Sequence, residues 1–258
     1  MSRLPGARWY GAGRTDVGLV RQANQDALFL RDELGLWIIA DGMGGHPGGD
    51  VASQVAVATT ATHMAKLAGA GRPGSCDRAD GLRQAVIQAN VALHAEGNAR
   101  PEYKGMGTTL IALHIEGFPQ ARATLAHVGD SRAYLHRDGA LSQLTRDHSW
   151  VEDQVRAGLL SAQDAATHHL RHMLTRALGI AAQVEPDLLS LRLQTGDRIL
   201  LCTDGLTKML SDGEILNALA GYGEDTQAVC DELVRLANER GGQDNVTVLL
   251  VSDQIGMA

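Results

Sequence analysis

Aromatic residues, cysteines and long apolar segments are all scarce in this sequence. Phe, Trp and Tyr together make up 3% of the 258 residues, so a folded core must be built mostly from Leu, Val, Ile and Ala. The cysteines (Cys76, Cys202 and Cys230) are odd in number and include no Cys-x-x-Cys pair, which favours buried thiols in a reducing compartment over a disulfide framework. No apolar stretch approaches the ~20 residues that span a bilayer.

Positive charge is scarce as well. The chain has 23 Lys and Arg against 30 Asp and Glu, a formal net charge of −7, and it lacks the basic excess of a protein that binds nucleic acid or an anionic membrane. Residues 1–14 are rich in Gly and Arg and lack the apolar core of a signal peptide. We therefore expect a soluble, cytoplasmic protein with no nucleic-acid or membrane partner. Because no linker, repeat or low-complexity segment interrupts the chain, we expect one domain over residues 1–258.

Apolar runs that end at an aspartate are the most informative feature of the chain. The run at residues 37–40, which we expect to be a buried strand, stops at Asp41 and is followed by a glycine-rich turn. Similar runs lie next to Asp130, Asp204 and Asp244. Asp-Gly alone is a common turn sequence, but glycine also lets the backbone approach a ligand closely. The repetition indicates that one site collects these carboxylates.

A set of aspartates shares this setting, each beside an apolar run and flanked by small residues: Asp26, Asp41, Asp130, Asp204 and Asp244. An oxygen-rich site of this kind selects hard cations such as Mg²⁺ or Mn²⁺. Two such ions ~4 Å apart can activate a bridging water and bind a phosphoryl group. Zinc is a poorer match, because the chain has no His-Glu-x-x-His motif and no cysteine pair. Any one of these aspartates could simply cap a strand or a turn, whereas the whole set favours a metal site.

Hydrophobic periodicity predicts groups of strands interleaved with helices. The predicted strands are residues 27–30, 37–40, 108–115, 121–128, 132–137, 140–144, 188–193, 198–203 and 245–251. The predicted helices are residues 51–66, 79–100 and 226–240, together with short helices that begin after Ser149, Ser161 and Ser211. Residues 1–14 are expected to be loose, and residues 163–179 to form a polar surface flap. Paired strands without regular βαβ alternation suggest stacked sheets with outer helices.

A series of short motifs resembles, in order, the motifs of the bacterial type 2C (metal-dependent, PPM-type) Ser/Thr protein phosphatases. The motifs lie at residues 21–26, 40–46, 105–109, 127–134, 144–149, 203–206 and 242–247. The resemblance covers residues 15–251, nearly the whole chain. A single Asp-Gly-Met-Gly-Gly string would be moderately specific, whereas the ordered series is highly specific.

The resemblance implies an α+β fold, an αββα four-layer sandwich in which two antiparallel sheets are flanked by helices. It places a metal site at one end of the sandwich. By position, Asp41 would bridge two metal ions, and the carbonyl of Gly42 would join the first ion.

Other positions match further roles in the family. Asp204 and Asp244 would bind the second ion, and Asp26 would hold water next to the metals. Asp130 would join Asp204 in a weaker third site, so that two or three Mn²⁺ or Mg²⁺ ions are expected. Arg21 matches the arginine that holds the substrate phosphate, a task that suits its planar fork of N–H donors.

The chain departs from the family pattern at two positions. Gln25 stands where many members carry glutamate; an amide oxygen can still ligate Mg²⁺ or hold its water, but one negative charge is lost and metal affinity could fall. Met43 stands where eukaryotic members place a histidine that serves as general acid, and methionine has no proton to give. His46 and a metal-bound water are the candidates for that task, and His46 as a structural turn residue is the alternative.

Other polar residues are expected to have structural roles. The flap histidines are expected to be solvated, with contact to substrate or a third ion left open: His168, His169 and His172. Several arginines are expected to form structural ion pairs: Arg132, Arg146 and Arg176. The thiol of Cys202 is expected in the core, because nothing nearby in the sequence would stabilise a thiolate.

These features predict a phosphoprotein phosphatase that acts on phosphoserine and phosphothreonine. In this hydrolase, a water shared by the two ions would attack phosphorus directly, and the lack of a Cys-x5-Arg signature agrees with a reaction without a phosphoenzyme. Solvent or His46 would protonate the leaving oxygen. The expected partners are phosphorylated proteins and a Ser/Thr protein kinase whose marks the enzyme reverses in signal transduction, and the chain is expected to be a monomer.

Two alternatives stay open. A pseudo-phosphatase would use the same fold as a binding module, which Gln25 favours and the presence of Asp41, Asp204 and Asp244 disfavours. A regulatory phosphatase would act on one dedicated phosphoserine in a partner-switching circuit, although such proteins usually carry sensor domains. The sequence does not identify the substrate or choose between Mn²⁺ and Mg²⁺.

Overall fold

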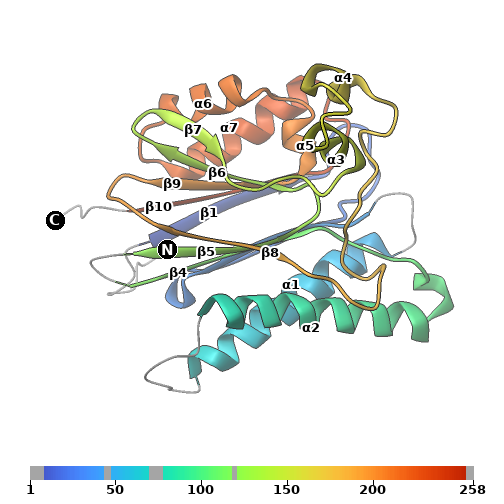
Figure 1. Cartoon of the computed structure of the whole chain (residues 1–258). Coiled ribbons are helices and arrows are strands. Elements are labelled where there is room, and N and C mark those ends of the chain that lie inside the picture. Colours follow the sequence, from blue (N-terminus) through green and yellow to red (C-terminus); the bar gives the residue numbers. More distant parts are fainter. Residues whose placement is uncertain (1–8, 44–47, 70–77, 118–120, 254–258) are drawn as a thin grey trace.

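Two five-stranded antiparallel sheets pack face to face, with helices against their outer faces (Figure 1). The computed structural model describes residues 9–43, 48–69, 78–117 and 121–253. In spatial order, the β3 sheet consists of β2 (Asp26–Arg31), β3 (Leu36–Asp41), β4 (Leu110–Glu116), β5 (Arg122–Val128) and β8 (Asp187–Arg192). The β9 sheet consists of β1 (Trp9–Asp16), β10 (Val246–Asp253), β9 (Arg198–Cys202), β6 (Arg132–Arg137) and β7 (Ala140–Gln143).

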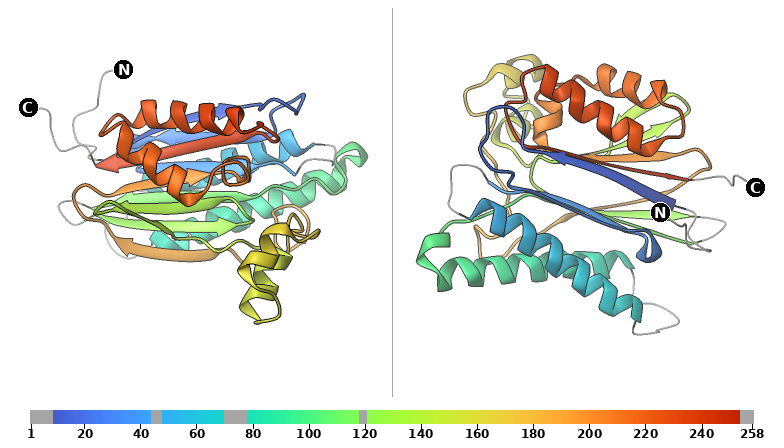
Figure 2. Two further views of the ribbon diagram at one scale, coloured as in Figure 1. Left: turned by 90° about the horizontal axis from the view of Figure 1, so that it is seen from above. Right: turned by 180° about the vertical axis from the view of Figure 1, so that it is seen from behind.

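Helices complete the outer layers. Two long helices, α1 (Gly49–Gly69) and α2 (Arg78–Ala99), cover the β3 sheet, and α6 (Asp212–Gly221) and α7 (Thr226–Glu239) cover the β9 sheet (Figures 1 and 2). The short helices α3 (Trp150–Arg156) and α4 (Ala162–Thr167) project from one end of the sandwich, next to α5 (Asp204–Thr207). The predicted α+β fold, an αββα sandwich, is confirmed. The extent of the single domain, residues 1–258, stays a prediction.

Burial on both faces explains why the central strands are apolar throughout rather than alternating. Successive side chains of a strand point to opposite faces. Ile38 therefore packs under α1 and α2, while Trp37 and Ile39 fill the space between the sheets. Likewise, Leu200 packs beneath α6 and α7, and Leu201 faces the space between the sheets. The sandwich thus has three apolar layers.

The first strand was not predicted. Residues 1–14 were expected to be loose, but β1 pairs along its whole length with β10. Glycine weakens the strand signal at Gly11, where it is required because a Cβ would lie 2.3 Å from Nε1 of Trp37. That indole instead donates a hydrogen bond to Asp32 Oδ1 at 2.9 Å. The glycine that hid the strand therefore makes room for the largest side chain between the sheets.

Most other predicted elements are present. The strands at 27–30 and 37–40 form the expected hairpin, joined by a short 3-10 helix (Asp32–Leu34). Ser211 and Glu214 form a complete capping box at the start of α6. The predicted flap is exposed over α4, but it is buried at Leu178, whose backbone exchanges two hydrogen bonds with Thr108.

Among the helices of the described ranges, none combines the length and the apolarity needed to cross a membrane.

Candidate metal centre

Strand ends from both sheets bring the candidate aspartates together at one end of the sandwich. In the β3 sheet, Asp26 begins β2 and Asp41 ends β3, and the two residues are register partners in this hairpin. In the β9 sheet, Asp204 follows the end of β9 and Asp244 precedes β10, which pairs with β9. Asp130 lies in the turn where the chain passes from β5 to β6, between the sheets.

Burial and mutual repulsion shift the pKa values of these carboxyl groups. Burial, followed by the charges of the other four aspartates, raises the pKa of Asp41 well above its usual value. Burial also raises the pKa of Asp26 to about 7 and that of Asp130 to about 7, with neighbouring aspartates adding to the shift. Carboxyl groups held this close in a low-dielectric site resist ionisation unless a cation offsets their charge.

Threonine hydroxyls from the β9 sheet hold Asp26 in place. Its Oδ2 accepts hydrogen bonds from Thr203 Oγ1 at 2.9 Å and from Thr247 Oγ1 at 2.7 Å. The other oxygen, Asp26 Oδ1, and Asp204 Oδ1 are buried and have no hydrogen-bond partner among the described residues. Orphaned oxygens of this kind are costly. An excess of buried carboxylates with unpartnered oxygens fits a hard divalent cation such as Mg²⁺ or Mn²⁺.

Backbone hydrogen bonds fix the Asp41-Gly42 corner. The carbonyl of Asp41 accepts from Thr108 Oγ1 and Thr109 N, and the N–H of Asp41 donates to Thr109 Oγ1. Gly42 donates its N–H to the carbonyl of Gln25, and a Cβ at Gly42 would lie 2.0 Å from the carbonyl oxygen of Gly49. Glycine is therefore required at position 42 by the close approach of the Gly49 backbone.

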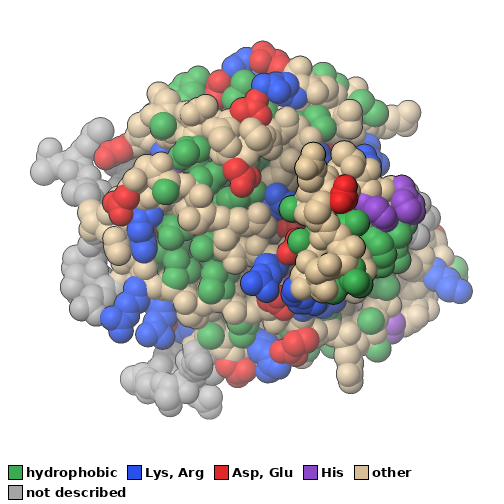
Figure 3. Space-filling view, turned by 45° about the horizontal axis from the view of Figure 1, so that its top comes forward, with side chains coloured by type: hydrophobic (Ala, Val, Ile, Leu, Met, Phe, Trp, Pro, Cys, Tyr) green, Lys and Arg blue, Asp and Glu red, His purple; other side chains and the backbone are tan. Residues whose placement is uncertain are grey.

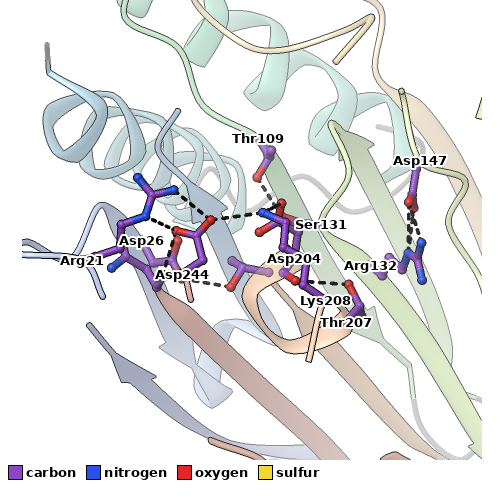
Figure 4. A network of polar contacts seen from close by, with 12 residues as sticks. Arg21, Asp26, Thr109, Ser131, Arg132, Asp147, Asp204, Thr207, Lys208 and Asp244 are labelled. Atoms are coloured by element: carbon purple, nitrogen blue, oxygen red, sulfur yellow. Dashed lines mark hydrogen bonds and ion pairs between the residues drawn. The ribbon is translucent and has the colours of Figure 1, made fainter. Parts of the chain in front are cut away.

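Two cations engage the carboxylates of the β9 sheet (Figure 4). Lys208 Nζ lies 2.5 Å from Asp204 Oδ2 and 3.1 Å from Asp244 Oδ2. The guanidinium of Arg21 binds both oxygens of Asp244, with Nε 2.9 Å from Oδ1 and Nη2 3.0 Å from Oδ2. Burial acts to raise the pKa of Asp244, but Lys208 and Arg21 outweigh it and hold that pKa below its usual value. For Asp204 burial prevails, and its pKa is raised.

Within the described residues, no group of three or more His, Cys, Asp or Glu side chains is arranged to hold a single ion as it stands. The carboxylates of Asp204 and Asp244 contact Lys208 and Arg21 instead. Binding an ion between the two sheets therefore requires local side-chain movement.

The turn that carries Asp130 is held by the segment that follows β7. The N–H of Gly129 donates to His148 Nδ1 at 3.0 Å, and the N–H of His148 donates back to the carbonyl of Gly129 at 2.8 Å. Ser131 Oγ lies 2.8 Å from Thr109 Oγ1, which links this turn to the support of Asp41. The positions of Asp130 and Asp41 are therefore coupled through hydroxyl groups.

Two open clefts meet at the aspartates. One, of about 560 Å³, is lined by Arg21, Asp41, Asp130 and Asp244. The other, of about 530 Å³, extends beneath α3 and α4. Lys208 lines both clefts. On the face shown in Figure 3, acidic and basic side chains are interspersed and form no large patch of one sign.

The two departures from the family pattern have different surroundings. A Cβ at Gly49, the first residue of α1, would lie 2.6 Å from Gln25 Nε2, so the Gln25 amide packs against the start of this helix. Met43 lines the first cleft and donates its N–H to the carbonyl of Gly107. The candidate His46 lies outside the described residues, as does Cys76, so their roles stay predictions.

The remaining sequence predictions have mixed outcomes. Arg132 and Arg176 form the expected ion pairs, with Asp147 and Asp187 respectively. Arg146 is exposed, and its expected ion pair is not seen within the described residues and stays a prediction. Cys202 is buried, and burial raises its pKa to about 12, as expected for a core thiol.

The flap histidines divide into two groups. His168 stacks on Trp150 with ring centroids 5.0 Å apart, and His169 lies against His168. His172 instead lines both clefts, next to Lys208 and the aspartates. The contact with the site that was left open for these residues is therefore available to His172.

Sequence reasoning missed several residues that support the site. Lys208 lies one helical turn after Asp204, and this spacing is the signal that could have found it. Thr203 and Thr247 lie within two of the motifs that resemble the phosphatase family. Their contact with Asp26, however, crosses from one sheet to the other. His148 also lies within one of these motifs, but its hydrogen bonds with Gly129 form only in the folded chain.

Comparisons with known proteins agree with this site. The family model described as Protein phosphatase 2C matches residues 17–250. The chain is 41% identical over 239 residues to the serine/threonine protein phosphatase PstP of Mycobacterium tuberculosis, a match that covers 93% of this chain and 44% of the relative. It therefore spans less than half of the length of that relative. It is 37% identical over 249 residues to the serine/threonine phosphatase stp of Listeria monocytogenes, covering 92% of this chain and 93% of the relative.

A solved structure is similar as well. The catalytic domain of PstP in complex with two manganese ions superposes with a TM-score of 0.82 at 38% identity, covering 95% of this chain and 97% of that chain.

Proposed function

Because this chain belongs to the protein phosphatase 2C family, a family of metal-dependent Ser/Thr protein phosphatases, we propose that it hydrolyses phosphoserine and phosphothreonine in proteins. The observation that carries the proposal is the convergence of buried carboxylates from both sheets, with raised pKa values and unpartnered oxygens, beside an open cleft. The solved structure of a relative with two manganese ions supports Mn²⁺ or Mg²⁺ as the cofactor.

The proposed ligands come from both sheets. Asp41 and the carbonyl of Gly42 would hold one ion from the β3 sheet, and Asp204 and Asp244 would hold the second ion from the β9 sheet. Asp130 would join Asp204 at a third position. When bound, the ions supply a water that is activated at neutral pH for direct attack on phosphorus, and they offset charge on the phosphoryl oxygens.

Asp26 would orient the attacking water. Its Oδ2 is fixed by two threonine hydroxyls, so Oδ1 is the oxygen left to accept a hydrogen bond from that water. A carboxylate whose position is set in this way can orient a water without further loss of side-chain entropy.

Arg21 would bind the phosphate group of the substrate. Its side chain is 41% exposed and lines the first cleft. In this structure its guanidinium group binds both oxygens of Asp244. The same group fits two phosphate oxygens. Arg21 would therefore exchange Asp244 for the substrate phosphate when Asp244 turns to an ion.

Protonation of the leaving oxygen falls to solvent or to His46. His172 is the histidine of the flap that lines the cleft, but burial and the charge of Lys208 hold its pKa below the usual value. A neutral imidazole is too weak an acid to serve as the general acid at pH 7. Solvent therefore suffices in this proposal, and His46 would add to it.

The cellular setting is proposed from the family. Substrates would be phosphorylated proteins in the cytoplasm, and the partner enzyme would be a Ser/Thr protein kinase whose marks the phosphatase removes. We propose that the chain acts as a monomer, because the aspartates that form the site all come from one copy of the chain.

The test is hydrolysis of p-nitrophenyl phosphate and of a phosphothreonine peptide in EDTA, Mg²⁺ or Mn²⁺. The variant is Asp204→Asn, and the matched control is Asp138→Asn, in a hairpin turn between β6 and β7. Metal-dependent turnover by the wild type and the control, lost in Asp204→Asn, is the expected result. Folded wild-type protein that shows no turnover with either metal would overturn the proposal in favour of a binding module.

A further inference from the structure

We propose that Lys208 is a built-in counter-cation that competes with the second metal ion for Asp204 and Asp244, and thereby sets how tightly the chain holds that ion. The inference rests on the proposed metal site, but it concerns binding and does not depend on turnover.

The position of Lys208 is fixed by the fold. It lies at the end of α5, where its N–H donates to the carbonyl of Asp204 at 2.8 Å. From there the ammonium reaches both carboxylates of the β9 sheet, at 2.5 Å and 3.1 Å, and Figure 4 shows it between them. Its side chain is 27% exposed, so the contact is sheltered from solvent.

The ammonium occupies oxygens that an ion would need. An ammonium has three N–H donors and no lone pair, so it can bind carboxylates but cannot be a metal ligand. Lys208 takes Asp204 Oδ2 and Asp244 Oδ2, while the other oxygen of Asp244 accepts from Arg21 and from the N–H of Asn245. Of the four oxygens of Asp204 and Asp244, Asp204 Oδ1 has no hydrogen-bond partner among the described residues. An ion that binds both residues must therefore compete with these two cations, and Lys208 is the one that contacts both carboxylates.

Charge makes the competition unavoidable. Asp204 and Asp244 carry two negative charges when ionised, and Lys208 and Arg21 together carry two positive charges. A divalent ion at the same oxygens would place like charges within a few ångströms, in a site with a low effective dielectric constant. The long, flexible lysine side chain can yield by turning into the clefts that it lines. Lys208 therefore stabilises the site without an ion and weakens the binding of the ion.

The same contact has a second consequence. Removing the lysine charge leaves Asp204 and Asp244 to repel each other in the absence of metal. A neutral substitution should therefore lower the melting temperature in EDTA while it tightens metal binding. A side chain with a purely structural role would lower stability without improving affinity, so the two effects together identify the counter-cation.

The test is calorimetric titration of Mn²⁺ into wild-type protein, Lys208→Met and Lys208→Gln, with melting temperatures measured in EDTA. Lys66→Met, an exposed position near the end of α1, is the matched control for loss of one positive charge. We expect the dissociation constant of the weaker Mn²⁺ site to fall about 10-fold in both Lys208 variants, a change of the size that residues around a metal site produce. We also expect their melting temperature in EDTA to fall, and Lys66→Met to change neither quantity.

Unchanged or weaker Mn²⁺ binding in the folded Lys208 variants would overturn the inference, as would an unchanged melting temperature in EDTA. If Lys208→Met does not fold, Lys208→Gln, which keeps N–H donors at similar reach, decides the question. Calorimetry needs no substrate, so an inactive protein that binds Mn²⁺ would contradict the proposed function alone. Metal-dependent turnover with no tightening in the variants would contradict this inference alone.

Discussion

The β3 sheet and the β9 sheet supply carboxylates that differ in their neighbours. Asp41, at the end of β3, lies among other aspartates, and its pKa is raised well above the usual value by burial and their charges. Asp244, just before β10, is bound by Arg21 and Lys208, and its pKa is held below the usual value. The same side chain at the same end of the sandwich therefore has opposite titration behaviour. Neighbouring cations outweigh burial at Asp244, whereas burial prevails at Asp41 and at Asp204.

The largest expected effect tests whether the two halves act as one site. Asp41→Asn and Asp244→Asn should each lower the rate of phosphothreonine peptide hydrolysis in Mn²⁺ at least about 100-fold, since even residues that only support metal ligands can reach that size. The reason is that each variant removes a proposed metal ligand from one side of the two-metal centre. Asp138→Asn serves as control. Near-normal turnover in either site variant would mean that one sheet alone carries the chemistry.

In both halves, the glycine that follows a site aspartate packs closely against a neighbouring backbone, and alanine substitutions test this similarity. A Cβ at Gly42 would lie 2.0 Å from the carbonyl oxygen of Gly49, and one at Gly205 would lie 1.9 Å from that of Asn245. Because backbone atoms cannot yield as a flexible side chain can, Gly42→Ala and Gly205→Ala should each lower the free energy of unfolding by about 1–3 kcal/mol.

Gly213→Ala is the matched control, because nothing lies within 4 Å of its added Cβ. Its free energy of unfolding should stay within about 0.5 kcal/mol of wild type in urea titrations. An unchanged free energy of unfolding in Gly205→Ala would show that the backbone around Asp204 can move to accept a Cβ. That result would contradict the proposed similarity of the two aspartate–glycine turns.

Stability without metal should change in opposite directions when Asp41 and Asp244 are substituted. The folded chain holds the Asp41 proton more tightly than the unfolded chain does, so the Asp41 contribution to stability falls as pH rises above about 4 toward its raised pKa. In EDTA at about pH 8, Asp41→Asn should therefore raise the free energy of unfolding in urea titrations.

Asp244→Asn should do the opposite in the same experiment. Its lowered pKa means that its ionised form adds stability above the unfolded-state pKa, and this stability is lost as pH falls. Removing that charge at about pH 8 should lower the free energy of unfolding, since Lys208 and Arg21 lose a partner. Changes of the same sign in the two variants would refute the comparison.

The smallest expected effect concerns His127, on β5 of the β3 sheet. Burial, and then the neighbouring His148, lowers its pKa to about 3, and neither ring nitrogen has a hydrogen-bond partner among the described residues. Asp187 opposes the shift and Arg176 adds to it. The unfolded chain binds a proton there below about pH 6.5 and the folded chain does not. The free energy of unfolding therefore decreases as the pH is lowered.

His127→Gln should remove this dependence. Between about pH 7 and pH 5.5, the wild type should lose about 1 kcal/mol more unfolding free energy than the variant. An NMR titration of the His127 ring in the wild type gives an independent check. A midpoint near the ordinary histidine value would contradict the prediction.

Local sequence signals predicted much of the fold and the candidate aspartates. The β2–β3 hairpin and the Ser211–Glu214 cap depend on residues close together in the chain, and both could be inferred from spacing. Asp41 and Asp204 were found because each ends an apolar run. Ordered motifs then supplied what spacing could not, namely that these strand ends meet.

Contacts between the sheets explain what was missed. The strand β1 was hidden by Gly11, whose lack of a side chain matters only because Trp37 of the other sheet packs there. Leu178 reads as part of a polar flap, yet it is buried through its backbone pairing with Thr108. Lys208 has an evident partner in Asp204 by helical spacing, but its second partner, Asp244, is brought near only by the pairing of β9 with β10.

The most direct test of one metal centre built by both sheets is a calorimetric Mn²⁺ titration of wild type, Asp41→Asn and Asp204→Asn, with turnover measured on the same samples. We predict that the wild type binds at least two ions per chain, the number present in the solved PstP catalytic domain. Each variant, with its change in a different sheet, should lose ion binding and turnover together. Unchanged Mn²⁺ binding in both variants, or wild-type turnover that persists in EDTA, would contradict the account.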